Sequence, residues 1–141
     1  MFHPQNTLAL LSLMGFDGLQ IRDDSYVSFR FCGEVYETAR MDNYACLGIR
    51  REVYSFDEYV ATLETGDEMM GMNPNLQCLF SDGDCVRIRL CVPCASASDY
   101  ETALLGGMDK MDSIRSEFES RVQQRLFKMA APVFENILHK R

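Results

Sequence analysis

The order in which two kinds of hydrophobic spacing follow one another most constrains the fold of this chain. Three segments, residues 26–32, 35–41 and 44–50, alternate apolar and polar residues, which is typical of strands with one buried face. A capped helical segment, a second pair of alternating segments and a long helical stripe follow. This order predicts an α+β fold: a single-layer antiparallel sheet of about five strands with helices packed on one face.

Two helical segments frame the first three strands. The first is predicted from Leu8 to about Gly15. The second begins after Ser55, which can accept a hydrogen bond from the third helical amide while Glu58 reaches back to form a capping box. We expect Gly66 to end this helix, because glycine is a poor helix former and a common stop signal.

The last part of the chain carries the strongest helical signal. A helix capped by Asp99 has an apolar stripe with spacings of three and four residues. The stripe consists of Leu104, Met108, Met111, Ile114, Phe118, Val122 and Leu126. Pro132 is expected to break this helix and to begin a short C-terminal helical extension over residues 132–141.

The alternation in the strands predicts which residues face the core. The first three strands should direct inward Val27, Phe29, Phe31, Val35, Ala39, Met41, Ala45, Leu47 and Ile49. Glu37 falls on the apolar side in this phase, which would fit only a sheet edge. The next hairpin is expected to have the three-residue loop Ser81-Asp82-Gly83, which pairs Cys78 with Val86 and Leu76 with Ile88.

The same alternation predicts an outward face rich in tyrosine and arginine. Both residue types are enriched at the energetic centres of protein interfaces, because each combines a large contact area with polar atoms. The predicted partner-binding residues are Tyr26, Arg30, Tyr36, Arg40, Tyr44, Arg50, Arg87 and Arg89. A solvated antiparallel face with no partner is the alternative interpretation.

Length and charge limit the function classes. A chain of 141 residues fits one domain, with a core over about residues 6–127. The net charge of −7 argues against nucleic-acid binding, because binding to phosphates is largely electrostatic. No stretch has the roughly 18 apolar residues of a membrane helix, and the apolar run after residue 8 lacks a basic segment before it. The prediction is a cytoplasmic protein without membrane contact.

Six cysteines raise the question of a metal or redox site. Four of them, Cys78, Cys85, Cys91 and Cys94, lie close together in the sequence, but their phases along two strands direct them to different faces. Free thiols that serve packing are therefore expected, with no metal and no cofactor. A small-ligand or redox/metal-sensing module built on this cysteine-rich hairpin is the alternative function.

Catalysis finds little support in the sequence. The histidines, His3 and His139, lie near opposite ends of the chain, so a Ser–His or Cys–His pair is not expected. The prediction is therefore a non-enzymatic protein.

The layout resembles the YbjN family of bacterial proteins and the wider type III secretion chaperone-like fold, over roughly residues 6–127. The resemblance is carried by the opening helix Leu8–Gly15, the run Tyr26-Val-Ser-Phe-Arg-Phe, the meander through Tyr44-Ala-Cys-Leu-Gly-Ile, the helix from Ser55, the loop at Asn73, the hairpin at Asp82-Gly83 and the helix from Asp99. It implies helices on one face of an antiparallel sheet, homodimers, and binding of other polypeptides without catalysis. It carries over no functional residue.

Together these observations predict a non-enzymatic protein-interaction module, chaperone-like or regulatory in character. It would bind a polypeptide partner through the outward sheet face and the terminal helix.

Overall fold

The computed structural model describes residues 4–22, 26–40, 43–81 and 84–139 of the chain. The elements are, in order, α1 (Pro4–Leu13), β1 (Asp17–Arg22), β2 (Tyr26–Phe31), β3 (Glu34–Arg40), β4 (Tyr44–Glu52), α2 (Phe56–Met72), β5 (Leu76–Ser81), β6 (Cys85–Pro93) and α3 (Ala97–His139). The strands form one antiparallel sheet in the order β1-β2-β3-β4-β6-β5. The fold is therefore α+β with one open sheet, as predicted.

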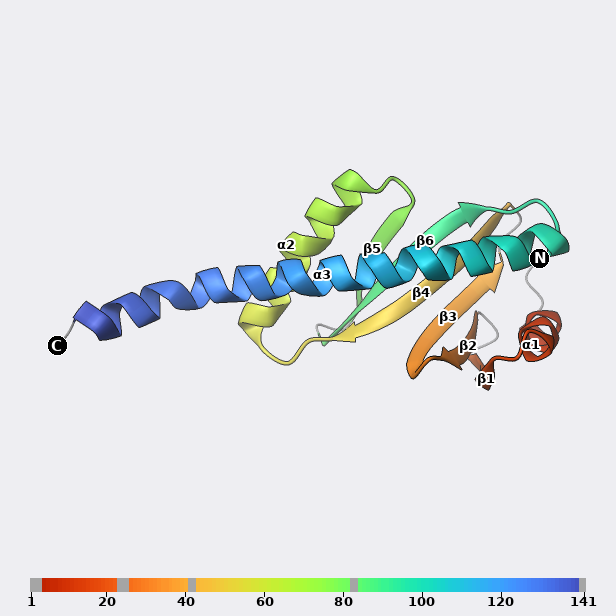
Figure 1. Cartoon of the computed structure of the whole chain (residues 1–141), viewed down its shortest axis with the longest axis horizontal. Helices are drawn as coiled ribbons and strands as arrows, with labels where there is room; N and C mark the ends of the chain where they lie inside the picture. Colours follow the sequence, from red (N-terminus) through yellow and green to blue (C-terminus); the bar gives the residue numbers. More distant parts are fainter. Residues whose placement is uncertain (1–3, 23–25, 41–42, 82–83, 140–141) are drawn as a thin grey trace.

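The described helices pack on one face of the sheet (Figure 1). α3 crosses β4 and β6, α2 lies beside α3 over β5, and α1 packs on β1 and β2 at the other end of the sheet. The C-terminal part of α3 extends beyond the edge of the sheet (Figure 1). The described helices leave the opposite face of the sheet uncovered, and this face, called the open face, carries the candidate site.

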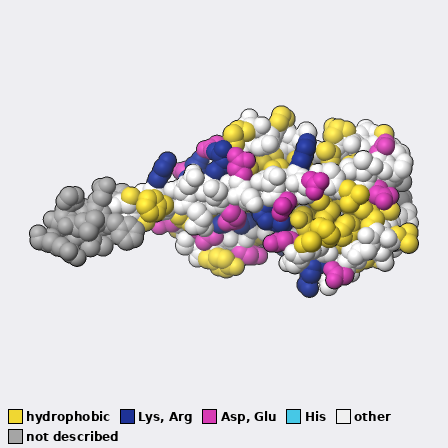
Figure 2. All heavy atoms as spheres, viewed as in Figure 1, with side chains coloured by type: hydrophobic (Ala, Val, Ile, Leu, Met, Phe, Trp, Pro, Cys, Tyr) yellow, Lys and Arg dark blue, Asp and Glu magenta, His cyan; other side chains and the backbone are white. Residues whose placement is uncertain are grey.

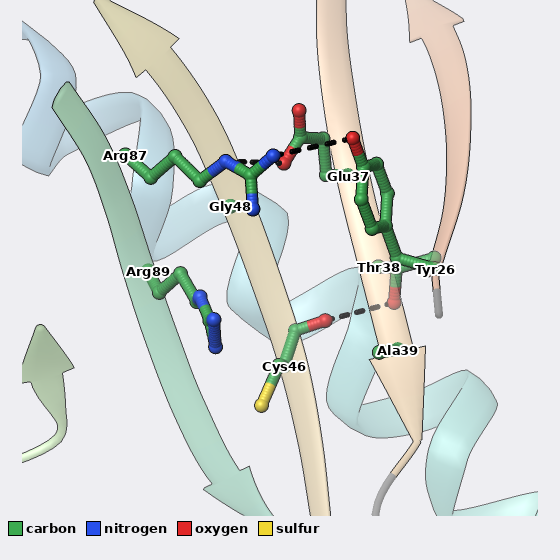
Figure 3. A pocket seen from close by; sticks show the side chains of 8 residues that line it. All are labelled: Tyr26, Glu37, Thr38, Ala39, Cys46, Gly48, Arg87 and Arg89. Atoms are coloured by element: carbon green, nitrogen blue, oxygen red, sulfur yellow. Dashed lines mark hydrogen bonds and ion pairs between the residues drawn. The ribbon is translucent and has the colours of Figure 1, made fainter. Parts of the chain in front are cut away.

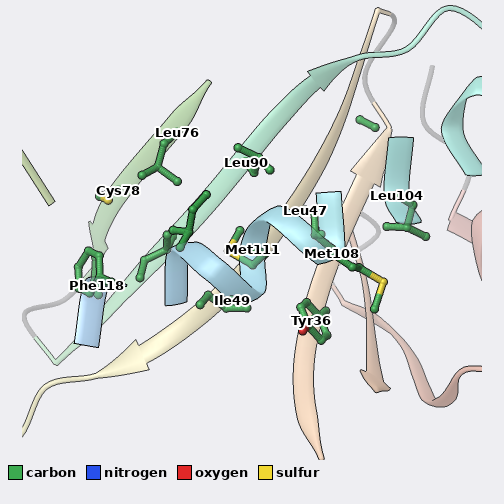
Figure 4. Close-up of a cluster of buried hydrophobic side chains, with 14 of the residues drawn as sticks. Tyr36, Leu47, Ile49, Leu76, Cys78, Leu90, Leu104, Met108, Met111 and Phe118 are labelled. Atoms are coloured by element: carbon green, nitrogen blue, oxygen red, sulfur yellow. The ribbon is translucent and has the colours of Figure 1, made fainter. Parts of the chain in front are cut away.

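The core lies between the sheet and α3 (Figure 4). Leu47 and Ile49 of β4 and Ile88 of β6 face Met111 and Phe118 of α3, and all are buried. The predicted stripe of α3 is the buried side of that helix from Leu104 to Val122, with Leu126 partly buried at its end. Burial of these side chains, worth about 1.5–3 kcal/mol each, fixes α3 on the sheet.

Charged side chains line the junction of α2 and α3 (Figure 2). Arg121 of α3 forms ion pairs with Glu68 of α2 and with Glu117 one turn earlier, and Arg125 also pairs with Glu68. These contacts lie at the surface above the apolar core, so they orient the two helices.

The structure confirms one predicted helix start and corrects three helix boundaries. Ser55 caps α2, because its hydroxyl accepts a hydrogen bond from the Glu58 amide at 3.1 Å. α1 begins earlier than predicted, at Pro4, and ends at Leu13. For α3, the hydroxyl of Ser96 accepts a hydrogen bond from the Asp99 amide at 3.2 Å, so Ser96 takes the capping role predicted for Asp99.

Two expected helix breaks are wrong. α2 continues through Gly66 to Met72. A Cβ at Gly66 would lie 3.2 Å from the Cβ of Cys78, so glycine here lets α2 approach β5 instead of ending the helix. α3 continues as one helix through Pro132 to His139, in place of a separate extension. Proline removes one amide donor, but its φ of about −65° is compatible with a helix.

The sheet formed by the described residues has six strands, where about five were expected. The additional strand, β1, follows α1 directly and pairs with β2 through an irregular register between Asp17 and Gln20. Its Leu19 and Ile21 pack against the core, but two alternating residues in a short segment are a weak strand signal.

The predicted register of the hairpin from β5 to β6 is wrong by two residues. Cys78 pairs with Ile88 and Leu76 with Leu90. A shift of two residues keeps every side chain on its predicted face, so the faces are confirmed. The predicted loop residues Asp82 and Gly83, as well as Met41, lie outside the described residues.

Candidate functional site

Six of the eight predicted partner-binding residues lie on the open face of the sheet. Tyr26 and Arg30 come from β2, and Tyr44 and Arg50 from β4. Arg87 and Arg89 come from β6, opposite Arg50 and Gly48 of β4. Their shared face follows from the register, since directly paired residues on neighbouring strands point to the same side.

The prediction is wrong for Tyr36 and Arg40, which lie on the helix-covered face. Tyr36 pairs with Phe29 in the register and stacks on its ring with centroids 5.5 Å apart, and only 4% of it is exposed. The guanidinium of Arg115 in α3 lies 5.1 Å from the Tyr36 ring centroid. Arg40 shares the phase of Tyr36 and pairs with Ala45.

The phase of β3 is therefore shifted by one residue, which places Val35, Glu37 and Ala39 on the open face. The physical reason is Glu37. A carboxylate facing the core would lose its hydration without compensation, whereas a tyrosine can bury its ring and keep its hydroxyl bonded. The position of Glu37 on the predicted apolar side was the signal for this phase.

Glu37 joins two arginines on the open face. Its Oε1 accepts a hydrogen bond from Nε of Arg50 at 2.5 Å, and its Oε2 lies 3.8 Å from Nε of Arg87. Burial opposes the charged form of Arg50, but the hydrogen bond and the charge of Glu37 outweigh it and raise the pKa of Arg50. Arg50 is therefore held charged at the centre of the open face.

Tyr26 contacts the same two guanidinium groups, of which Figure 3 shows that of Arg87. Its hydroxyl accepts hydrogen bonds from Nη2 of Arg50 at 2.7 Å and from Nη2 of Arg87 at 3.3 Å. The guanidinium carbon of Arg87 also lies 5.2 Å from the centroid of the Tyr26 ring, which is the geometry of a cation–π contact.

A hollow of about 150 Å³ opens beside this cluster (Figure 3). It is lined by Tyr26, Glu37, Thr38, Ala39, Cys46, Gly48, Arg87 and Arg89. The hollow exists because three of its lining residues, Ala39 of β3 and Cys46 and Gly48 of β4, have small side chains or none. A Cβ at Gly48 would lie 3.2 Å from Cγ of Arg89 and 3.4 Å from the Ile88 carbonyl oxygen, so glycine here lets the Arg89 side chain lie close to β4.

Positive charge exceeds negative charge at this hollow. Arg50, Arg87 and Arg89 stand against the single carboxylate of Glu37. Arg89 forms no hydrogen bond or ion pair with any residue in the described part of the chain, and Nε of Arg87 is buried without a hydrogen-bond partner there. Guanidinium groups of this kind bind carboxylates and phosphates.

The four cysteines of the hairpin region do not form one site. Cys78 lies on the covered face against α2, and Cys94 follows β6, where its thiol donates to the Ser96 carbonyl at 3.3 Å. Cys85 and Cys91 lie on the open face at opposite ends of β6. Within the described ranges no group of three potential metal ligands comes together. Burial, and to a smaller extent the negative charge of Asp67, raises the pKa of Cys78 to about 11.

One thiol pair was missed by the sequence analysis. Cys46 of β4 lies directly opposite Cys91 of β6, and their Sγ atoms are 3.2 Å apart. The pKa of Cys46 is raised to about 12 by burial, by the hydrogen bond to Cys91 and by the charge of Cys91. The two residues are 45 positions apart in the sequence, so only the pairing of β4 with β6 reveals their contact.

Comparison with protein-family models, curated proteins and solved structures finds no match to this chain. No helix in the described residues combines the length and the apolar character that a membrane span requires.

Proposed function

We propose that this protein is a non-enzymatic protein-interaction module, chaperone-like or regulatory, that binds an acidic segment of a polypeptide partner on the open face of the sheet. The observation that carries this proposal is the excess positive charge at the hollow. Arg89 is unpaired among the described residues, and Arg87 has a buried Nε without a hydrogen bond. A partner carboxylate would supply an acceptor for the guanidinium group of Arg89, beside the positive charge of Arg87.

The size of the hollow favours a side chain over a small-molecule ligand. Pockets for cofactors and drug-sized ligands have volumes of about 300–1,000 Å³, whereas this hollow has about 150 Å³. One carboxylate with its methylene groups fits such a space. Around it, Tyr44, Val35 and Leu79 are exposed apolar side chains on the same face, which a polypeptide backbone lying across the sheet would cover.

The terminal helix has a different part in this proposal from the one expected. The stripe of α3 is buried against the helix-covered face, so a partner on the open face would not contact it. The extension of α3 beyond the sheet, with Phe127 exposed, is the surface where a second copy would add contacts. The homodimer implied by the resemblance stays a prediction, and sedimentation equilibrium tests it.

The proposed function is tested with a short labelled peptide of alternating Glu and Ser, whose binding is followed by fluorescence anisotropy. Peptides of Gln and Ser and of Lys and Ser serve as ligand controls. Arg89→Gln should weaken binding of the acidic peptide by about tenfold, which corresponds to about 1.4 kcal/mol. Arg40→Gln removes the same charge from the helix-covered face and should leave the affinity within about twofold.

Two results would overturn the proposal. One is equal binding of the acidic and neutral peptides, or no binding of either. The other is an equal loss of affinity in Arg89→Gln and Arg40→Gln, which would show only a response to net charge.

A further inference from the structure

Cys46 and Cys91 form a dithiol on the open face, near the start of β4 and the end of β6. They are direct partners in the antiparallel register of β4 and β6, and their Sγ atoms are 3.2 Å apart. Directly opposite residues in antiparallel strands have Cα atoms about 4.5–5.5 Å apart. This separation lies inside the range of about 4.4–6.8 Å found in disulfides. The backbone therefore already satisfies the main geometric condition for a bond between these thiols.

The other described thiols lack this arrangement. Cys78 lies on the opposite face of the sheet, and the Cys94 thiol donates to a backbone carbonyl beyond the end of β6. Cys85 pairs with Glu52 in the register and Cys32 lies in the turn after β2. Only the pair on β4 and β6 joins two thiols across neighbouring strands in the described part of the chain.

We propose that Cys46 and Cys91 are a modification site for low-molecular-weight disulfides, in which Cys91 forms a mixed disulfide with one half of the reagent and Cys46 then closes a cross-strand disulfide. In the first step, the Cys91 thiolate attacks one sulfur of the disulfide, whose S–S bond breaks and releases one thiolate. In the second step, the Cys46 thiolate attacks Sγ of Cys91 and expels the other thiolate. The two protein thiols lose two protons and two electrons, and the small disulfide is reduced to two thiols.

The surroundings decide which cysteine reacts first. Cys91 is partly exposed, whereas Cys46 is buried. Both cysteines line a second hollow of about 490 Å³ together with Tyr44, Pro74 and Arg89, which gives a small disulfide room to approach the more exposed thiol. The positive charge of Arg89 in this hollow would attract a reagent that carries carboxylates, such as glutathione disulfide.

Cys46 is suited to the second step. Only 8% of it is exposed, and its pKa is raised to about 12 by burial and by its contact with Cys91, so it forms little thiolate near neutral pH. Once Cys91 is part of a mixed disulfide, its Sγ, which Cys46 must attack, is already adjacent. High local concentration then compensates for the small thiolate fraction.

This inference does not depend on the proposed binding function, because it rests on the thiol pair alone. A bond between the two sulfurs would tie β4 to β6 beside the basic hollow, whose floor includes Cys46.

The experiment treats the full chain carrying Cys32→Ser and Cys85→Ser with glutathione disulfide, because those two thiols are exposed or partly exposed and would react on their own. Intact mass spectrometry should show the loss of two hydrogen atoms. Trypsin places Cys46 in the peptide 41–50 and Cys91 in 90–110. These two peptides should be cross-linked in the oxidised protein and separate after reduction. Because Cys94 shares the second peptide, Cys94→Ser should retain the cross-link.

Two single variants in the same background test the order of steps. Cys46→Ser should stop at a stable glutathione adduct on Cys91, and Cys91→Ser should form neither product at Cys46. Circular dichroism verifies that both variants are folded. The proposal is overturned if the parent protein forms no link between peptides 41–50 and 90–110, or if that link is lost in Cys94→Ser. It is also overturned if Cys91→Ser forms a glutathione adduct on Cys46.

Discussion

Among the polar side chains, Arg51 should contribute most to the free energy of unfolding. Arg51 projects from β4 to the helix-covered face and is only 11% exposed. Its Nε and Nη2 donate to the two carboxylate oxygens of Glu119 in α3 at 2.6 and 3.2 Å, and its Nη1 donates to Glu58 in α2 at 2.9 Å. One guanidinium group thus joins the sheet to both long helices. We predict that Arg51→Met, which keeps the apolar stem, lowers the free energy of unfolding substantially.

The magnitude follows from the exposure of the two partners. Glu58 is 19% exposed, so its bond to Arg51 belongs with hydrogen bonds to charged groups, worth about 1.5–3 kcal/mol. Glu119 is 44% exposed, so screening reduces its share to about 0.2–1 kcal/mol. The sum is about 2.5 kcal/mol. At about 4 °C per kcal/mol for a chain of this size, the melting temperature should fall by about 10 °C.

Thermal unfolding followed by circular dichroism measures this effect, with Arg50→Met as the matched control. Arg50 is the next residue of β4, but it lies on the open face, is 44% exposed and bonds one carboxylate. Its loss should cost about 1 kcal/mol or less. If Arg51→Met and Arg50→Met lower the melting temperature equally, the assignment of Arg51 as the joint between sheet and helices is wrong.

Three further predictions concern stability. Phe118→Ala removes a fully buried ring between α3 and the sheet and should cost about 3–5 kcal/mol in urea unfolding; a cost below about 1 kcal/mol would contradict this packing. Gly106→Ala should stabilise the protein by up to about 1 kcal/mol, because a Cβ there meets nothing within 4 Å. Gly66→Ala places its Cβ 3.2 Å from Cys78, so it should stabilise the protein less or destabilise it. Equal gains in stability would refute the close contact of α2 with β5. Cys46 and Tyr100 keep their protons to a pKa of about 12 in the folded state against ordinary values of 9.0 and 10.0. The unfolded state therefore binds fewer protons than the folded state above pH about 9, so stability should fall as the pH rises from about 9 to 12; constant stability across this range would contradict their burial.

The sequence predicted those parts of the fold that depend on strong local periodicity. β2, β4 and β6 have regular alternation, and the predicted faces of Phe29, Leu47 and Ile88 are confirmed. The buried stripe of α3 was also predicted, because spacings of three and four residues persist over many turns. In these segments every position supports the same phase, so one exceptional residue does not change the result.

Local rules failed where tertiary contacts outweighed them. In β3, tyrosine and glutamate compete for the core, and the ring of Tyr36 is buried because Phe29 and Arg115 receive it. Gly66 is normally read as a helix stop, but the approach of β5 requires a residue without a side chain there.

The candidate site was predictable in its residue types but not in its geometry. Tyrosine and arginine on alternating positions indicated the open face. The pairing of Glu37 with both Arg50 and Arg87 depends on β3 lying next to β4 and β4 next to β6, which no short stretch of sequence encodes. The contact of Cys46 with Cys91 depends on the same neighbouring strands.

The central claim is that an acidic polypeptide segment binds at the basic hollow of the open sheet face, and amide chemical-shift mapping tests it most directly. The isotope-labelled protein is titrated with the Glu and Ser peptide while the backbone amide signals are followed. The largest shifts are expected at Glu37, Gly48 and Arg89, which lie on three of the four strands that line the hollow. Shifts concentrated in α1 or along α3, with these amides unchanged, would contradict it.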